Sequence, residues 1–383
     1  MTRPLDVCIR GDGIVGHVLA LLFARERLRV GLVCDANARA SHLTDVRAYA
    51  LNHQSRDLLT SLRCWPDPAQ ATPVLAMQVR QSGGGEVNFD AQQQGVAALA
   101  WIVDVASLQA QLADALRFQS GVELLPQPRD ATLTVVCEGR DSGSRRQFGV
   151  EWDVTDYAQW AIAARVHCAL PHRGMACQWF GAQDITGFLP LDGEGGNSMA
   201  IVWSVHSEHY ARWMEIDPEL FAQQLQSTSE DRFGRLALTS ARAAWPLQLA
   251  NARRWSGVTG GASWVLAGDA AHVVHPLAGQ GLNLGLADAQ QLAHEIHSRD
   301  YWRGVNDAKL LRRYERSRKA DVALMGAATD GLQRLFSRSG AAWQGVRQWG
   351  MAGFDNSAVV KRWVASRAMG SADNELATIN KTT

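Results

Sequence analysis

Residues 265–289 constrain the fold of this chain more than any other stretch of its 383 residues. They read VLAGDAAHVVHPLAGQGLNLGLADA, in which an apolar strand near Trp264 runs into a Gly-Asp turn, then a loop rich in Pro and Gly, then a helix. Such a loop places the backbone N–H groups of Gly279, Gln280 and Gly281 at a helix start, where partial positive charge can hold an anion. Asp269, at the end of the strand, is placed to accept hydrogen bonds from a polyol.

A second glycine-bearing turn lies near the start of the chain, inside a strand–turn–helix–strand pattern over residues 7–34. Its residues Gly11, Gly13 and Gly16 fit the spacing G-x-G-x-x-G, which allows a tight turn, a close approach of pyrophosphate and close packing of helix on strand. Asp35 ends the second strand, where an acidic side chain binds ribose hydroxyls. A glycine turn that binds no nucleotide is the alternative. Together the two turns predict a cofactor with a pyrophosphate, a sugar chain and an electron-accepting ring, which is the description of FAD.

Composition excludes several classes of protein. The formal net charge is zero and no basic run stands out, so a nucleic-acid partner is not expected. Six cysteines occur without a C-x-x-C pair, and Cys8, Cys34 and Cys137 lie in apolar runs typical of buried strands. No metal site or disulfide is therefore predicted, and a reducing cytoplasm is the expected compartment.

The chain shows neither a secretory leader nor an uncharged apolar stretch of the roughly 20 residues that span a bilayer. We expect a soluble protein that contacts a membrane at most peripherally, at its inner face. The segment with Trp343, Trp349 and Trp363 is either an interfacial helix or a C-terminal helix packed on the cofactor lobe.

The order of predicted elements indicates an α/β fold made of two interleaved lobes. Strands and helices of the dinucleotide-binding type alternate with β-rich stretches, including a hairpin over residues 74–96 and strands near 159–168, 175–180 and 199–205. From about residue 281 onward we expect helix throughout. The predicted division is a Rossmann-type FAD-binding lobe over 1–74, 97–156 and 252–330, a β-rich substrate lobe over 75–96 and 157–251, and a C-terminal helical segment with a polar tail over 331–383.

A third turn follows another apolar strand and reads CEGRDSGSR over residues 137–145. With this turn in place, the sequence resembles the FAD-dependent aromatic hydroxylases, and among them the ubiquinone-biosynthesis hydroxylases, over nearly its whole length. The resemblance includes DVRAYAL at 45–51, WIVD at 101–104, FLPL at 188–191 and LRRYERSRK at 311–319, and the block GDAAHVVHPLAGQGLNLG is its most specific part. One departure is Glu138, because the family has the shorter Asp at this position.

The resemblance implies roles for individual residues. The three glycines of the first turn would hold the pyrophosphate, Asp35 the adenosine ribose, Arg47 the phosphates and Asp269 the ribityl hydroxyls. The helix start near Gly279 would stabilise negative charge on the reduced flavin. The full set predicted to contact the cofactor is Gly11, Gly13, Val15, Gly16, Asp35, Arg47, Glu138, Gly139, Gly268, Asp269, Pro276, Gly279, Gln280, Gly281, Leu282 and Asn283.

No catalytic residue is assigned from the sequence. His272, His275 and Pro276 are the candidates, and a loop histidine is more often a hydrogen-bonded spacer than a base. Trp179, Phe180, Phe188, Leu189 and Trp203 either line an apolar substrate pocket or fill the core.

The activity that the resemblance implies is hydroxylation of the aromatic ring of a polyprenylated phenol in ubiquinone biosynthesis, by O₂ and through a C4a-hydroperoxide of the flavin. NAD(P)H or another donor would act as a transient reductant, and a biosynthetic multiprotein complex is a further expectation. Two alternatives stay open: a flavin-dependent reductase or dehydrogenase on the same scaffold, and a non-catalytic FAD-binding subunit.

Overall fold

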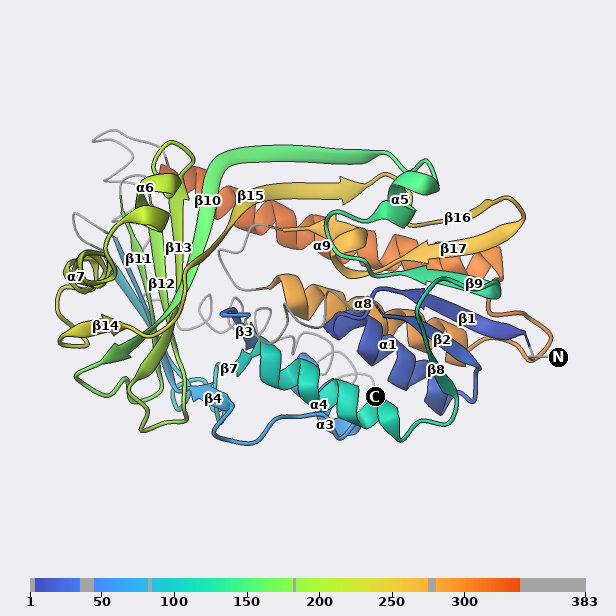
Figure 1. The fold of residues 1–383 in the computed structure, drawn as a ribbon, viewed down its shortest axis with the longest axis horizontal. Helices are drawn as coiled ribbons and strands as arrows, with labels where there is room; N and C mark the ends of the chain where they lie inside the picture. The colour runs from blue at the N-terminus through green and yellow to red at the C-terminus, as the bar shows by residue number, and fades with distance from the viewer. Residues whose placement is uncertain (1–3, 35–44, 82–84, 182–183, 275–279, 338–383) are drawn as a thin grey trace, which may run out of the picture.

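The computed structural model describes residues 4–34, 45–81, 85–181, 184–274 and 280–337, with side chains of the last stretch described to residue 324. Two large sheets lie at opposite ends of the molecule, and a small sheet and the longer helices lie between or beside them (Figure 1). The α/β fold with two interleaved units is confirmed. Asp35, His275, Pro276, Gly279 and the tail from residue 338 lie outside the described residues.

A six-stranded sheet carries the pattern recognised at the start of the chain. Five of its strands run parallel to one another, in the order β17, β9, β1, β2 and β8. Parallel neighbours need a crossover connection, because the chain must return to the edge of the sheet at which the strands begin. The sheet has the order β16–β17–β9–β1–β2–β8, with β16 antiparallel at one edge. The strands are β1 (Leu5–Arg10), β2 (Val30–Val33), β8 (Val122–Leu125), β9 (Ala131–Val136), β16 (Ser256–Thr259) and β17 (Ala262–Leu266).

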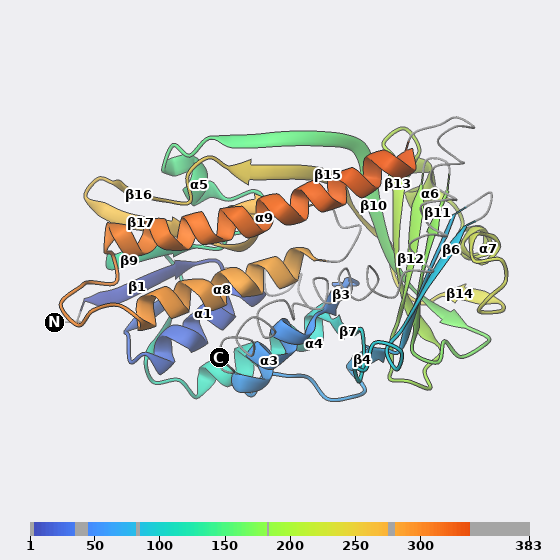
Figure 2. The same cartoon turned by 180° about the vertical axis from the view of Figure 1, so that it is seen from behind.

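Helices pack beside this sheet and beside one another (Figure 2). α1 (Ile14–Arg25) contacts both α4 (Val105–Arg117) and α8 (Gly281–His297), and α9 (Ala308–Ser337) runs along α8. α1 is almost wholly buried, since it is apolar on most sides. α4 buries Leu108, Leu112 and Leu116, which are spaced four residues apart and so share one face of the helix. The expectation of continuous helix from residue 281 is wrong between α8 and α9, where residues 298–307 form turns around Gly304.

The second large sheet holds nine strands and is mostly antiparallel. Its order is β18–β15–β10–β13–β12–β11–β5–β6, and β14 pairs with β10 beside β15. The strands are β5 (Ala76–Gln81), β6 (Glu86–Asp90), β10 (Trp152–Cys168), β11 (Met175–Phe180), β12 (Ile185–Pro190), β13 (Ser198–His206), β14 (Leu236–Leu238), β15 (Ala243–Ala252) and β18 (His272–Val273). β5 and β6 form the expected hairpin.

β10 is the longest strand, and it leaves the vicinity of the six-stranded sheet before it enters the nine-stranded one (Figure 1). β15 pairs with it along both parts, with a register shift between Asp156 and Gln159. A bulge of this kind bends a strand while its pairing continues on both sides. The residue ranges proposed for the two lobes stay predictions, but β10 and β15 physically join the two regions.

The two faces of the nine-stranded sheet pack against different partners. One face, with Trp179, Phe188 and Trp203, packs under α7 (Pro218–Thr228) against Phe221. Of the two roles considered for these three residues, the core role therefore applies. The other face packs against a three-stranded sheet of order β3–β7–β4, formed by β3 (Ala48–Leu51), β4 (Ala71–Val74) and β7 (Ala100–Asp104), and contributes Ala176, Leu191 and Ala200 to that contact.

Within the described residues, no helix has the length and the apolar character needed to cross a bilayer. Two further helices, α3 (His53–Ser61) and α5 (Gly143–Gln147), complete the elements near the predicted site, and the short α6 (Tyr210–Glu215) lies on the nine-stranded sheet.

Candidate cofactor site

The three predicted turns follow three neighbouring parallel strands. β9 pairs with β1 on one side and with β17 on the other. Gly11 follows β1, Glu138 follows β9 and Gly268 follows β17. Because the carboxyl ends of parallel strands lie at the same edge of a sheet, these turns gather at one place, which is where open α/β sheets bind their ligands.

Two glycines of the first turn are required by the backbone around them. Gly11 has a φ of +116°, and a Cβ there would clash with the Cys137 carbonyl oxygen. A Cβ at Gly16 would clash with the Gly11 carbonyl oxygen. These two positions therefore make the turn tight enough for β1, β9 and α1 to pack closely.

Gly13 differs, since a Cβ built there meets nothing within 4 Å among the described atoms. It is the N-cap residue of α1, and no side chain of the described residues caps that helix. α8 likewise begins at Gln280 without a side-chain cap from the described part of the chain, whereas α3, α4, α5 and α7 are capped by Asn52, Asp104, Ser142 and Asp217. An open glycine beside uncapped N–H groups fits the approach of a phosphate to α1.

The Gly-Asp turn places the Asp269 carboxylate at the sheet edge where the three turns gather. Gly268 has a φ of +61° and opens a short 3₁₀ turn, Gly268–Ala270. The Asp269 side chain is exposed to solvent, yet so much protein surrounds it that burial raises the pKa of its carboxyl above the usual value. A carboxylate that is surrounded by protein and still reached by solvent can accept hydrogen bonds from a bound polyol.

Two side chains connect the three turns. The first is Val15 of α1, which lies against two glycines. A Cβ added at Gly268 would lie 3.3 Å from Val15 Cγ2, and one added at Gly285 would lie 2.8 Å from it. Because neither glycine has a side chain, α1 can approach both the Gly-Asp turn and α8. Arg145 is buried and donates from Nη1 to the Ala270 carbonyl oxygen at 3.1 Å. Val15 was among the predicted residues, whereas Arg145 was not.

Arg47 lies in the segment before β3 and already has an anionic partner. Its Nε donates to both carboxylate oxygens of Asp45, at 2.9 and 3.0 Å, and its Nη1 lies 3.4 Å from the Tyr49 hydroxyl. The Asp45 carboxylate raises the pKa of the Arg47 guanidinium further above its usual value. Arg165 of β10 donates to the carbonyl oxygen of Val46 at 3.4 Å and forms an ion pair with Asp104, and so ties this segment to the nine-stranded sheet.

Asn283, in the first turn of α8, uses its side chain within the protein. Its Oδ1 accepts from the Asn52 N–H at 3.0 Å and from the Ser55 hydroxyl at 2.7 Å, and its Nδ2 donates to the Ala50 carbonyl at 2.8 Å. The amide therefore fixes the start of α8 against β3 and α3. Gly281 and Leu282 are partly exposed at the same helix start, and their contact with a cofactor stays a prediction.

Glu138, the departure from the family pattern, also binds within its own turn. Its carboxylate accepts from the Ser142 hydroxyl at 2.7 Å and from the Ser144 N–H at 2.8 Å, at the beginning of α5. Gly139 follows with a φ of +79°, a conformation that favours glycine. The longer side chain thus stabilises the turn, and a direct role of either residue toward a cofactor stays a prediction.

His272, the catalytic candidate that the structure describes, is buried, with 1% of its surface exposed. Its Nε2 lies 2.7 Å from Asp288 Oδ2, and its ring stacks on Trp255 at a centroid distance of 5.0 Å. These contacts fit the hydrogen-bonded spacer considered for a loop histidine, and a catalytic role of His272 stays a prediction. The other two candidates, His275 and Pro276, lie outside the described residues.

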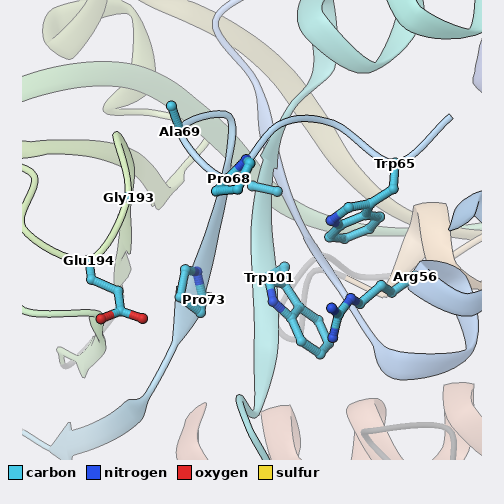
Figure 3. A pocket seen from close by; sticks show the side chains of 9 residues that line it. Arg56, Trp65, Pro68, Ala69, Pro73, Trp101, Gly193 and Glu194 are labelled. Carbon is cyan, nitrogen blue, oxygen red and sulfur yellow. The ribbon is translucent and has the colours of Figure 1, made fainter.

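A cavity of about 430 Å³ lies beside the three-stranded sheet, where Ala71 and Pro73 of β4 and Trp101 of β7 line it (Figure 3). Trp65 and Trp101 line one wall, where the Arg56 guanidinium lies 4.2 Å from the Trp101 ring centroid, and Glu194 lies on the opposite wall. None of the predicted cofactor residues that the structure describes lines it.

The fold is that of FAD-dependent aromatic monooxygenases. The solved structure of p-nitrophenol 4-monooxygenase PnpA from Pseudomonas putida superposes with a TM-score of 0.74 at 17% identity, covering 96% of this chain and 98% of that one. Ubiquinone hydroxylase UbiL of Rhodospirillum rubrum is 28% identical over 96% of this chain and 90% of its own length. The 3-demethoxyubiquinol 3-hydroxylase of Escherichia coli is 28% identical over 96% of this chain and 99% of its own.

The sequence profile of the FAD binding domain family matches residues 69–328, which is more than half of the chain. The chain belongs to this family. Its cofactor is FAD, as the sequence predicted, and it is an enzyme of the FAD-dependent monooxygenase class.

Proposed function

We propose that this protein hydroxylates the aromatic ring of a hydrophobic quinone precursor in ubiquinone biosynthesis, with FAD as cofactor and O₂ as the oxygen donor. The observation that carries the proposal is the joint position of the uncapped starts of α1 and α8 and the Asp269 carboxylate, which supports FAD binding. The relatives UbiL and the 3-demethoxyubiquinol 3-hydroxylase, similar over nearly their full lengths, support the pathway.

The residues of the chain have separate parts in this function. The N–H groups at the start of α1 would bind the pyrophosphate, and Asp269 would accept hydrogen bonds from the ribityl hydroxyls. Arg47 would approach the phosphates with the guanidinium N–H groups that Asp45 leaves available. FAD supplies the two-electron chemistry that activates O₂.

The sheet face opposite α7 supports an apolar ring as substrate. The residues on that face are mostly small: Ala161 pairs with Ser204, and Ala163 pairs with Val202. On the other side of Val202 lies Gly187, which has no side chain. The face belongs to the same side of the sheet that contacts β3, the strand fixed to the start of α8 by Asn283. Such a surface would hold a planar ring and exclude water from it.

We further propose that the substrate carries a polyprenyl tail, that NAD(P)H or another donor reduces the enzyme transiently, and that the protein meets its substrate at a membrane surface or within a biosynthetic complex. The names of the relatives support a quinone-type substrate for those proteins. An expected outcome is that purified protein binds liposomes containing a prenylated phenol more strongly than liposomes without it.

The test of the activity is labelled oxygen. Holoenzyme with a reductant, a prenylated phenol and ¹⁸O₂ should yield a product one ¹⁸O atom heavier, measured by mass spectrometry. Oxidation of the substrate without ¹⁸O would indicate a reductase or dehydrogenase instead. A bound flavin that no nicotinamide or ferredoxin donor reduces would indicate a non-catalytic FAD-binding subunit.

A genetic measurement checks the pathway separately. Deletion of the gene should lead to accumulation of an under-hydroxylated quinone precursor, and restored expression should remove it. An unchanged quinone pool in the deletion strain would contradict the pathway but not FAD binding.

A further inference from the structure

Asp288 is a buried carboxylate in the middle of α8, and it contacts the backbone of the Gly-Asp turn. Its side chain has 0% exposure. Oδ2 accepts from the Gly268 N–H at 2.8 Å and lies 2.7 Å from His272 Nε2, while Oδ1 accepts from Arg318 Nε at 2.7 Å. Three donors, two from the Gly-Asp turn segment and one from α9, therefore meet one anion.

The partners are as deeply buried as the carboxylate. The His272 side chain is 1% exposed and stacks on Trp255, and the Arg318 side chain is 6% exposed and donates through Nη2 to the Leu284 carbonyl at 3.3 Å. Removing charged groups from water costs several kcal/mol each, so a buried ionic group of this kind is not expected for stability alone.

The position of the donors shows what the carboxylate holds. Gly268 lies directly before Asp269, and His272 lies three residues after it, in β18. Asp288 therefore binds both ends of the short segment that carries the solvent-exposed Asp269. Arg318 neutralises the carboxylate from α9, which lets it accept the other two bonds without an unpaired charge.

We propose that Asp288 is a positioning residue for FAD: it fixes Gly268 and His272 from the buried side of the turn and thereby aims the Asp269 carboxylate at the cofactor. The inference rests on FAD binding and not on ring hydroxylation. Failure of one proposal therefore leaves the other testable.

The same carboxylate could serve only to join α8 to α9. The chain offers a matched control for that alternative, because Glu295 of α8 forms an ion pair with Arg313 of α9, and the Glu295 side chain is 5% exposed. Glu295→Gln weakens a contact between the same two helices without touching the Gly-Asp turn.

The experiment measures FAD dissociation constants of apoprotein by flavin fluorescence, together with the rise in melting temperature that saturating FAD produces. Asp288→Asn should weaken FAD binding about tenfold or more, because a charge-assisted acceptor is lost and the amide presents N–H groups to Arg318. It should also reduce the FAD-dependent rise in melting temperature. Glu295→Gln should change the FAD dissociation constant less than about twofold.

An Asp288→Asn protein with lowered melting temperature and unchanged FAD affinity, like Glu295→Gln, would overturn the proposal. A second pair of variants serves if Asp288→Asn does not fold. His272→Gln keeps a donor near the position of Nε2, whereas His272→Phe keeps only the stacking on Trp255. Positioning through the hydrogen bond predicts that His272→Gln keeps an FAD affinity close to wild type and that His272→Phe loses it. Equal FAD affinity in the two variants would contradict the proposal.

Discussion

The turn after β1 and the turn after β17 lie side by side, yet different interactions fix their shapes. The first is shaped by sterics: Gly11 and Gly16 have no room for a side chain. The second is shaped by charge, since Asp288 accepts bonds from the N–H of Gly268 and from His272. A turn of the first kind tolerates no added atom, whereas a turn of the second kind depends on which groups are ionised and paired.

The largest effect is expected at the first turn. Gly16→Ala should lower the free energy of unfolding by about 3 kcal/mol or more, because its Cβ would overlap the Gly11 carbonyl oxygen and force the backbone to move. Gly13→Ala is the matched control, with open space at the same turn and an expected loss of about 1 kcal/mol or less. Urea denaturation of the apoproteins measures both, and equal losses would contradict a steric origin.

The next effect concerns FAD retention at the second turn. Asp269→Ala should weaken FAD binding by about 1–3 kcal/mol, because the cofactor's hydroxyls would lose their acceptor, and the protein should be purified largely colourless. The urea midpoint of the apoprotein should not fall, since burial disfavours the ionised carboxylate. Full flavin content in this variant would remove Asp269 from the site.

The pH dependence of stability separates the two aspartates of the second turn. Burial raises the pKa of the Asp269 carboxyl above its ordinary 3.8, so its ionisation should reduce the stability of the apoprotein as pH rises from 3.8 through that higher value. Burial also acts to raise the pKa of Asp288, but His272 and Arg318 lower it more, and the net pKa lies below 3.8. Asp288 therefore stabilises the fold above pH 3.8, and this contribution is lost as the pH falls through the lower pKa.

Neutral variants should therefore behave oppositely. Asp269→Asn should stabilise the apoprotein at about pH 7 relative to wild type, and the difference should vanish at about pH 3. Asp288→Asn should destabilise it at about pH 7 and less so at about pH 3. Unfolding by urea at the two pH values provides the measurement, and the same sign for both variants at neutral pH would contradict the assignment.

The smallest effect is expected at the third turn, after β9. Glu138→Asp restores the residue type of the family but draws the carboxylate away from Ser144, and should cost about 1 kcal/mol of stability. FAD affinity should change by less than about twofold if the carboxylate only stabilises its own turn. A larger change, measured by flavin fluorescence, would place Glu138 at the cofactor.

The motifs predicted the three turns and the cofactor because each turn is local: a strand, a glycine and a helix start follow one another within a few residues. The interactions that join the turns were not predicted, since their partners are distant in sequence. Arg145 and the Ala270 carbonyl are separated by 125 positions, and no pattern within either segment relates them. A lone aspartate among the apolar residues of α8 was the available signal for Asp288.

Side-chain direction accounts for the other differences. Asn283 lies at the predicted helix start, but its amide binds Asn52 and Ala50 within the protein. The sequence left Phe188 and Trp203 open between a substrate pocket and the core, because alternation along a strand does not specify which face of a two-sided sheet will meet a helix such as α7.

The unbroken course of β10, with β15 beside it, has a consequence for protein engineering. A chimaera with junctions inside β10 and β15 must rejoin both strands in the same register, on either side of the shift between Asp156 and Gln159. Grafts with junctions in the turn after Phe148 and in the loop after Ala252 would carry the paired strands over whole and should give more soluble protein than grafts cut within either strand.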